Sequence, residues 1–351
     1  MIRHPELWLI FPVLVLAATM TSALRHYGVR WLLDHPNERS SHDQPVPRGG
    51  GLAIAAVFLV AVAVLWWFDP SHSRLFMALL LSGSVVAAAG YWDDHVDVRA
   101  RWRLLLHLGA AVLAAVLMGP MTTIPLPWTT IELPTWLGAT LTVMGLVWLL
   151  NLYNFMDGID GIAGGEAVSV ALAAAAIGFS QGVATPGLVL FAAACAGFLL
   201  FNWPPARIFM GDVGSGFAGF VFGLYVVHTS LAAPHWLWVW VILLAVFWID
   251  ATVTLLRRLA HGETPYAAHR THAFQNAARL LGSHRPVTVA VVAINTLFLA
   301  PLAFLAAHYP QWSFGFASIA VVPLAIAAIV LRAGQPEHLQ SGGVKADPAA
   351  L

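Results

Sequence analysis

Charge is scarce in this sequence, and so is cysteine. Only 10% of the 351 residues are Asp, Glu, Lys or Arg, and 17 basic residues balance 17 acidic ones. That balance leaves no basic excess from which a nucleic-acid partner would be predicted. Cys195 is the single cysteine, so a disulfide framework is excluded. An ordinary soluble domain is excluded as well, because 59% of the residues are hydrophobic and the mean hydropathy is +0.77.

Long apolar runs are what the chain has instead. About 18 apolar residues can cross a bilayer as a helix, which satisfies its own backbone hydrogen bonds there. Eleven runs are candidates, at about 6–24, 50–68, 74–91, 104–119, 135–151, 162–180, 185–202, 213–230, 235–256, 287–307 and 312–331. We therefore predict an all-α, polytopic integral membrane protein with about eleven transmembrane helices. Residues 1–332 would form one transmembrane catalytic domain with a retained N-terminal anchor, and residues 333–351 a polar, disordered tail.

The basic residues predict how the chain is oriented. With eleven spans the two termini lie on opposite sides of the membrane. One side then holds fifteen of the seventeen Lys and Arg residues, whereas the other keeps Arg3 and Arg74. The positive-inside rule makes the richer side cytoplasmic. The same assignment puts the C-terminus and every acidic motif on the cytoplasmic face, so we predict one cytoplasmic site.

The carboxylates cluster in short polar breaks between the apolar runs. Three of these breaks read GYWDDHVDVRARWR (90–103), NLYNFMDGIDG (151–161) and FMGDVGS (209–215). A charge near a bilayer is costly, so several carboxylates at helix ends on one face need a functional reason. Together they suggest a divalent metal and a phosphorylated substrate.

Asp93 and Asp94 stand side by side at the end of the third predicted span. Mg²⁺ usually takes one or two protein carboxylates together with phosphate oxygens, so this pair suits the metal. One of the two could instead act as a base. A third interpretation is a solvated loop that is ion-paired to the arginines of segment 99–103. The residues alone leave the three interpretations open.

Asn154, Asp157 and Asp160 share a glycine-rich segment. Glycine lets a backbone approach a ligand closely, and two acids three residues apart would share a face on a helical turn. A polar capping turn is the alternative. Asp212 stands at the start of a predicted helix, where free backbone amides suit a phosphate and where a plain N-cap is the alternative.

Two further motifs carry an aromatic and a basic residue. Phe209 could stack on a base or could be a core aromatic. Arg48 lies in DHPNERSSHDQPVPRGGG (34–51), whose glycines permit close backbone approach and whose prolines are equally typical of a rigid connector.

The last motif contains His269, Arg270 and His272. An Arg and His cluster suits recognition of a diphosphate, and zinc is disfavoured because no third soft ligand is evident. Asp250 is separate, since it lies inside the ninth predicted span. An embedded acid is a functional hypothesis by default, and a side chain that reaches out to the interface is the alternative.

The five motif blocks, in order from about 34 to 275, resemble the polyprenyl-phosphate N-acetylhexosamine-1-phosphate transferase family, glycosyltransferase family 4. The loop DHPNERSSH…PVPRGGG and the block AHRTHAFQ are most similar to the O-antigen-initiating branch. The peptidoglycan branch carries a run of three histidines where this chain has HRTHAFQ, so the resemblance speaks against a muramyl-pentapeptide substrate.

The resemblance also implies roles for individual residues. Asp93, Asp94 and Asp212 would be catalytic. Asp212 would bind Mg²⁺, with Mn²⁺ as an alternative metal, and Asp93 and Asp94 would serve the lipid phosphate or the metal. The implied substrate-binding residues are Arg48, Asn154, Asp157, Asp160, Phe209, His269, Arg270 and His272. Of these, Phe209 would stack on uracil, and the Arg and His cluster would hold the diphosphate. The implied location is a bacterial inner membrane, with several passes through the bilayer and a cytoplasmic active site. The choice between a monomer and a homodimer stays open.

The implied reaction moves N-acetylhexosamine-1-phosphate from a UDP-N-acetylhexosamine to undecaprenyl phosphate and releases UMP. It would initiate O-antigen or another cell-surface polysaccharide. Because two anions must meet, charge neutralisation would be the main task of the site. The rival function is an ion- or proton-coupled transporter, which would hold ionisable groups near the membrane midplane, where only Asp250 is a candidate. The residues do not identify the sugar.

Overall fold

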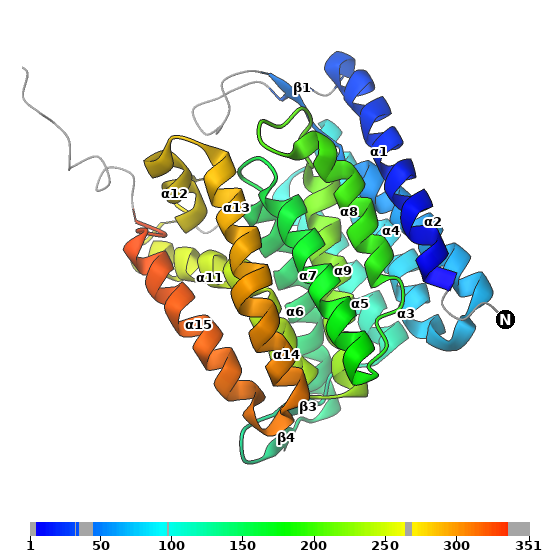
Figure 1. The fold of residues 1–351 in the computed structure, drawn as a ribbon, viewed down its shortest axis with the longest axis vertical. Helices are drawn as coiled ribbons and strands as arrows, with labels where there is room; N and C mark the ends of the chain where they lie inside the picture. Colours follow the sequence, from blue (N-terminus) through cyan, green and yellow to red (C-terminus); the bar gives the residue numbers. More distant parts are fainter. Residues whose placement is uncertain (1–4, 32, 35–44, 97, 264–268, 336–351) are drawn as a thin grey trace, which may run out of the picture.

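Fifteen α-helices follow one another in the computed structural model, which describes residues 5–31, 33–34, 45–96, 98–263 and 269–335 (Figure 1). They are α1 (Pro5–Trp31), α2 (Gly51–Phe68), α3 (Ser73–Met77), α4 (Gly83–Val96), α5 (Ala100–Met118), α6 (Thr135–Met156), α7 (Ile162–Gln181), α8 (Leu188–Asn202), α9 (Asp212–Ala232), α10 (Trp236–Leu243), α11 (Ala245–Ala260), α12 (Ala273–Leu281), α13 (His284–Ile294), α14 (Ala300–His308) and α15 (Ser313–Val330). The π-helical segments η2 (Ala78–Ser82) and η3 (Asn295–Leu299) join α3 to α4 and α13 to α14. The short strands form two antiparallel pairs, β1 (Leu33–Asp34) with β2 (Val46–Pro47) and β3 (Thr123–Pro125) with β4 (Thr130–Glu132).

The prediction of an all-α, polytopic membrane protein is confirmed. In the described residues, nine helical stretches are long and apolar enough to span a membrane. The pair α10 and α11 makes a tenth if it counts as one span, and it is bent by 74°. The predicted span 185–202 is α8, which has 15 residues, whereas a straight span needs about 20. The predicted number of eleven is therefore reached only if both α8 and the bent pair cross the membrane.

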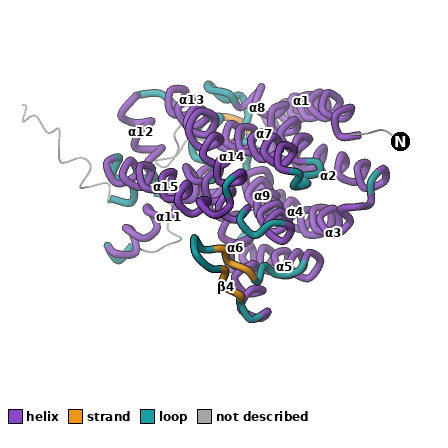
Figure 2. Tube along the Cα trace, turned by 60° about the horizontal axis from the view of Figure 1, so that its bottom comes forward, coloured by secondary structure: helices purple, strands orange, loops and turns teal. Residues whose placement is uncertain are grey.

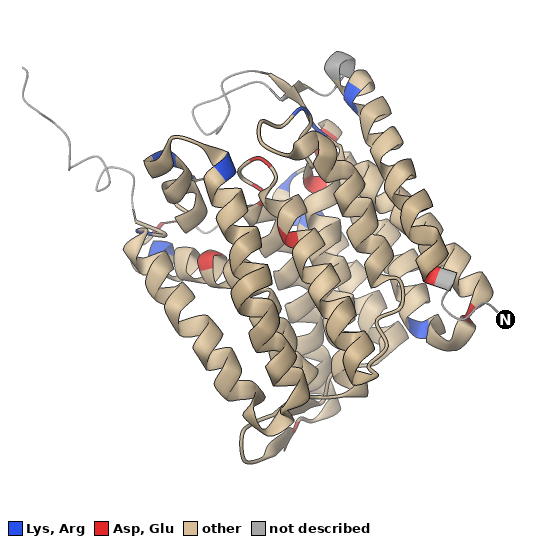
Figure 3. Ribbon diagram, in the orientation of Figure 1, with Lys and Arg blue, Asp and Glu red and all other residues tan. Residues whose placement is uncertain are grey.

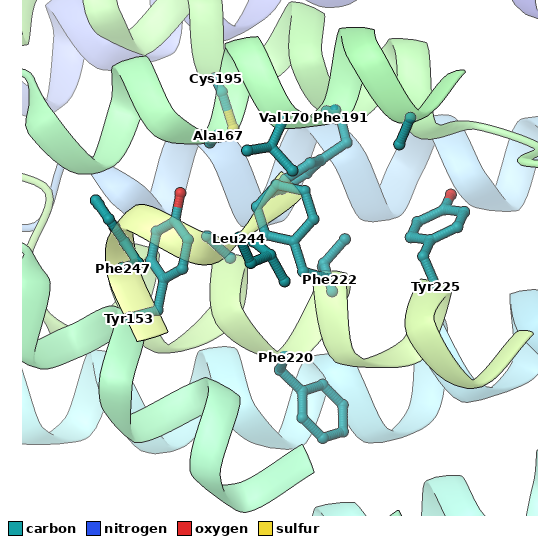
Figure 4. Close-up of a cluster of buried hydrophobic side chains, with 14 of the residues drawn as sticks. Tyr153, Ala167, Val170, Phe191, Cys195, Phe220, Phe222, Tyr225, Leu244 and Phe247 are labelled. Carbon is teal, nitrogen blue, oxygen red and sulfur yellow. The ribbon is translucent and has the colours of Figure 1, made fainter. Parts of the chain in front are cut away.

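Helix α9 lies inside the bundle, with α2, α4, α6 and α10 packed around it (Figure 2). Every residue from 213 to 225 is buried. Small residues allow this close packing, since a Cβ at Gly219 would lie 2.4 Å from the carbonyl oxygen of Leu149 in α6. Aromatic rings fill another side, where Phe222 meets Phe191 of α8 edge to face at 5.5 Å (Figure 4). The start of α9 is therefore held in place by neighbours on several sides.

Most of the charged residues lie towards one end of the bundle (Figure 3). Helices α4 and α6 end there, and α7 and α9 begin there. Three acidic motifs that are far apart in the sequence therefore lie at the same end. Long apolar helices leave polar residues only at their ends, which is why this grouping follows from the order of the spans.

The last described residues, 333–335, pack against the polar end. Ala333 is buried, and the amide of Gly334 donates a hydrogen bond to the carbonyl oxygen of Thr271 at 2.7 Å. The rest of the predicted disordered tail, residues 336–351, lies outside the described residues.

Candidate active site

Asp212 connects three helices at the polar end. It is the first residue of α9, and its Oδ1 accepts a hydrogen bond from Nδ2 of Asn154 in α6 at 2.8 Å. Its Oδ2 lies 3.2 Å from Nη1 of Arg103 in α5. The N-cap residue of α9 is Gly211, so Asp212 does not cap its own helix, and its carboxylate faces the other polar groups.

Asp93 and Asp212 converge on a single cationic atom. Nη1 of Arg103, which contacts Asp212, also forms an ion pair with Asp93. Asp93 is only 6% exposed, and its second oxygen accepts a hydrogen bond from the amide of Val98 at 2.8 Å. The arginine pairing that we considered for this segment is therefore present, but Asp93 is buried and does not belong to a solvated loop.

These two carboxylates fit a divalent cation. In the described residues, no three His, Cys, Asp or Glu side chains are grouped so that they could hold a metal by themselves. Mg²⁺ does not need three, because it commonly takes one or two carboxylates and completes its octahedral shell with water and substrate phosphate oxygens. Asp93 and Asp212 share one cationic partner, so the two carboxylates face a common point where a positive charge is already held.

Asp94 has a different surrounding from Asp93. Its Oδ1 accepts the amide of Asp212 at 3.0 Å, and its Oδ2 accepts the amide of Val213 at 3.2 Å. Both oxygens are therefore used to cap α9 from another helix, and these two amides are not free for a phosphate. Gly211 makes the contact possible, because its φ is +74° and a Cβ there would lie 2.6 Å from Oδ2 of Asp94.

Arg48 and Phe209 are held beside this cap. Nη2 of Arg48 donates to the backbone oxygen of Asp94 at 2.9 Å. The amide of Phe209 donates to the carbonyl oxygen of Pro47 at 2.8 Å, and its own carbonyl accepts from the amide of Gly50 at 2.9 Å. The glycine-rich loop after Arg48 thus pairs with the backbone before α9, and the side chain of Phe209 is half-buried.

Asp157 and Asp160 do not share a helical face, because α6 ends at Met156 and the next residues form a turn. Oδ2 of Asp160 accepts the amide of Ala206 at 2.9 Å, and its Oδ1 lies 3.3 Å from Nδ1 of His284. Asp157 is half-buried, and its carboxylate has no hydrogen-bond partner among the described residues. Burial, together with the negative charges of Asp94 and Asp160, raises the pKa of Asp157 to about 7.

Asp250 explains how the histidine motif is held. Its Oδ1 accepts the amide of Ala273 at 2.9 Å and lies 3.2 Å from Nδ1 of His272, and its Oδ2 accepts the amide of Phe274 at 3.0 Å. The hydroxyl of Thr254 donates to the same carboxylate. Asp250 is buried, so it neither reaches out to the interface nor stands alone in the membrane. It fixes the start of α12.

His269 and Arg270 complete this motif. Burial, with the nearby charges of His272 and Arg258, lowers the pKa of His269 to about 3, so His269 is neutral near pH 7. The permanent positive charge of the motif is therefore that of Arg270. Arg270 lines a cleft of about 500 Å³, together with Asp160, Pro204, Pro205, Arg279 and His284.

The loop 157–161 connects the carboxylate cluster with this cleft. It begins three residues after Asn154, and a Cβ at Gly158 would lie 2.9 Å from the side chains of both Phe274 and Gln275 in α12. Sequence patterns do not identify Arg279 or His284, because single basic residues carry no motif. They do not identify Asn202 either, whose two hydrogen bonds join separate loops.

The chain is similar in sequence to known proteins over most of its length. Residues 76–231 match the family model described as glycosyl transferase family 4, a segment that includes Asp93, Asn154 and Asp212. The chain is 30% identical over 278 residues to a probable undecaprenyl-phosphate N-acetylglucosaminyl 1-phosphate transferase of Bacillus subtilis, covering 76% of this chain and 75% of that protein.

Two further relatives have similar coverage. The decaprenyl-phosphate N-acetylglucosaminephosphotransferase of Mycolicibacterium smegmatis is 30% identical, with 76% of each chain covered. The undecaprenyl-phosphate alpha-N-acetylglucosaminyl 1-phosphate transferase of Escherichia coli is 25% identical, with 80% of this chain and 79% of that protein covered. The chain therefore belongs to glycosyl transferase family 4, the family of polyprenyl-phosphate N-acetylhexosamine-1-phosphate transferases.

Proposed function

We propose that this protein transfers N-acetylhexosamine-1-phosphate from a UDP-sugar to undecaprenyl phosphate and releases UMP. The observation that carries the proposal is the convergence of Asp93 and Asp212 on one cationic atom of Arg103. Two carboxylates and an arginine at one end of a bundle of membrane-spanning helices suit a reaction between a lipid-borne anion and a second phosphate. The names of the relatives favour N-acetylglucosamine as the sugar.

The reaction is an exchange at phosphorus. An oxygen of the lipid phosphate forms a bond to the β-phosphorus of the UDP-sugar, and the bond from that phosphorus to the α-phosphate oxygen breaks. UMP leaves with the electron pair. Because the second pKa of a phosphate monoester is about 6, the attacking group is largely ionised at neutral pH without a strong base. The work that remains for the protein is to neutralise charge and to align the two substrates.

Each residue of the site has a task in this scheme. Mg²⁺, which Asp93 and Asp212 would hold, supplies charge neutralisation at the phosphates when it is bound. Asn154 orients Asp212 through its hydrogen bond. Asp94 holds the first turn of α9 and so acts on Asp212 through the backbone. Arg103 forms ion pairs with both carboxylates and would add positive charge beside the reacting phosphates.

The nucleotide-sugar would lie on the side of Phe209 and Asp160. Asp160 and Arg270 line the same cleft, and Arg270 carries a permanent charge suited to a diphosphate. Phe209 is half-buried and would stack on the base. Asp157, near its pKa at neutral pH, would line the passage between this cleft and the metal-binding carboxylates.

The proposed setting is a bacterial inner membrane with the charged end of the bundle in the cytoplasm, where UDP-sugars occur. The product would start an O-antigen or another cell-surface polysaccharide. The rival interpretation as an ion- or proton-coupled transporter depended on Asp250. That carboxylate accepts hydrogen bonds from Ala273, Phe274 and Thr254, so it already has a structural task, and the observation that favoured a transporter is removed.

The decisive experiment uses the purified protein with undecaprenyl phosphate, Mg²⁺ and a panel of UDP-sugars, with UMP as the readout. We expect UMP release that requires both the lipid and the metal. Asp212→Asn keeps the shape of the side chain but removes its charge. It should lower activity at least ~100-fold, which corresponds to about 3 kcal/mol of lost transition-state stabilisation. A folded Asp212→Asn variant with normal turnover and normal Mg²⁺ dependence would exclude Asp212 from the site.

A further inference from the structure

One buried side chain joins two loops of the proposed site. The loop 157–161 lies between α6 and α7, and the loop 203–211 lies between α8 and α9. Asn202 is the last residue of α8 and is 3% exposed. Its Oδ1 accepts the amide of Gly161 at 3.0 Å, and its Nδ2 donates to the carbonyl oxygen of Ile208 at 2.9 Å. The two ends of one carboxamide thus hold one loop each.

The residue type follows from this arrangement. A carboxamide can accept at one end and donate at the other, whereas a carboxylate can only accept and an aliphatic side chain can do neither. Gly161 and Ile208 contribute backbone groups to a buried place, where an unpaired group is costly. The loops are also in direct contact, because a Cβ at Gly161 would lie 3.0 Å from Cδ of Pro204.

The two hydrogen bonds of Asn202 lie next to residues that are proposed to bind the nucleotide-sugar. Gly161 directly follows Asp160, and Ile208 directly precedes Phe209. A second link reinforces the first, since the amide of Ala206 donates to Oδ2 of Asp160 at 2.9 Å. The carboxylates at the metal side are attached differently, through α4, α5 and α9.

We propose that Asn202 is a positioning residue for the nucleotide-sugar half of the site. Its two hydrogen bonds hold the loop 157–161 against the loop 203–211, and we call this pair of bonds the clamp. The proposal rests on the proposed function. Without the clamp, Asp160 and Phe209 no longer have a fixed separation, so the nucleotide-sugar binds less tightly. Asp93, Arg103 and Asp212 keep their contacts, so the transfer step and the affinity for the lipid phosphate change little.

Two variants test the clamp in graded steps. Asn202→Ala removes both bonds, whereas Asn202→Asp keeps an acceptor for the amide of Gly161 and loses the donor to Ile208. For both we expect the KM for UDP-N-acetylglucosamine to rise about fivefold or more, with kcat and the KM for undecaprenyl phosphate within about twofold of the wild type. Amide hydrogen exchange of a peptide spanning 157–163 should accelerate in Asn202→Ala and stay slow in Asn202→Asp.

A matched control removes a buried hydrogen bond elsewhere. The hydroxyl of Tyr225 is buried towards the other end of α9 and donates to the carbonyl oxygen of Pro186 at 2.6 Å. Tyr225→Phe should lower the melting temperature without changing either KM. This separates a specific effect on the site from a general loss of stability.

The outcomes are distinct. If the wild type releases UMP but both Asn202 variants keep its KM for UDP-N-acetylglucosamine, the positioning role is wrong. If the wild type releases no UMP with any UDP-sugar, the proposed function fails, and hydrogen exchange, which needs no substrate, still decides the clamp. Unchanged exchange of the peptide 157–163 in Asn202→Ala would then overturn it. If Asn202→Asp does not fold because it buries a charge, Asn202→Ala, which adds none, carries the test.

Discussion

The carboxylate of Asp94 accepts the backbone amide of Asp212 at 3.0 Å and so caps helix α9 from a neighbouring helix. Asp93, one residue earlier, contacts Arg103 instead. Successive side chains on an α-helix point about 100° apart, so two adjacent acids at the end of α4 meet different groups. Asp93 belongs to the charge cluster of the site, whereas Asp94 keeps Asp212 in its place.

This division predicts that substitutions at the two neighbouring positions affect different properties, stability at Asp94 and turnover at Asp93. Asp94→Asn turns an amide group towards a backbone donor, so we expect it to lower the free energy of unfolding by about 1–3 kcal/mol. Asp93→Asn keeps one oxygen for the amide of Val98, so it should lower the free energy of unfolding less than Asp94→Asn does, while it lowers kcat at least ~30-fold with UDP-sugar binding intact, because it removes one charge from the carboxylate pair. Thermal unfolding in detergent and steady-state kinetics measure both. Equal effects of the two substitutions on stability and turnover would contradict separate roles.

The sequence predicts the general position of this site, but not the contacts between residues that are far apart in the chain. The number and length of the apolar runs predict that the acidic motifs lie at one end of the helix bundle, and in the structure they do. The division between Asp93 and Asp94 does not follow, because it depends on where α9 begins relative to α4. The shared helical face that we considered for Asp157 and Asp160 is wrong, since α6 ends at Met156 and both residues lie in the turn that follows.

Asp250 shows the same limit. The sequence marks it as unusual, because it is an acid within an apolar run, but it does not reveal a partner 23 residues away. The length of α8 and the 74° bend between α10 and α11 are likewise set by packing, and composition alone overestimates the straight spans.

A prediction for Asp250 follows from its hydrogen bonds. Asp250→Asn replaces one accepting oxygen by an amide nitrogen, which leaves at least one buried donor of α12 unpaired. We expect a loss of about 1–3 kcal/mol in the free energy of unfolding and a raised KM for the UDP-sugar, because His272 loses its partner. Thr254→Val is the matched control, since it removes a single hydroxyl donor from the same carboxylate and should cost less. A larger loss for Thr254→Val than for Asp250→Asn would refute this order.

Glu166 gives a prediction away from the site. It is fully buried in α7 and accepts a hydrogen bond from Nδ2 of Asn295 in η3, while its Oε1 and the Oδ1 of Asn295 have no partner among the described residues. Glutamine keeps the accepting oxygen and carries no charge in this buried place, so Glu166→Gln should be at least as stable as the wild type. Glu166→Leu leaves the amide of Asn295 without this partner and should cost about 1–3 kcal/mol in the free energy of unfolding. Melting temperatures that rank leucine above glutamine would show that the pair does not stabilise the bundle.

Asp157 predicts how stability depends on pH. Burial raises its pKa from the ordinary 3.8 to about 7, so the folded protein holds this proton more tightly than the unfolded chain does. The stability that Asp157 contributes is therefore full below about pH 4 and is lost as the pH rises to about 7. Asp157→Asn carries no charge at any pH. At pH 8 its free energy of unfolding should exceed that of the wild type by about 1–3 kcal/mol, a range that allows for partial solvent exposure, and its melting temperature should be higher.

The difference in the free energy of unfolding between Asp157→Asn and the wild type should become smaller as the pH falls towards 4. Melting curves with a metal chelator exclude a contribution from bound Mg²⁺. Asp69 is the control of opposite sign, because hydrogen bonds from Ser71 lower its pKa, so its contribution is present at neutral pH and is lost on acidification. Asp69→Asn should therefore be destabilised at pH 8 and approach the wild type near pH 3. If Asp157→Asn were no more stable than the wild type at pH 8, the carboxylate of Asp157 would not be half-buried as described. Its proposed place between the cleft and the carboxylates of Asp93 and Asp212 would then be wrong.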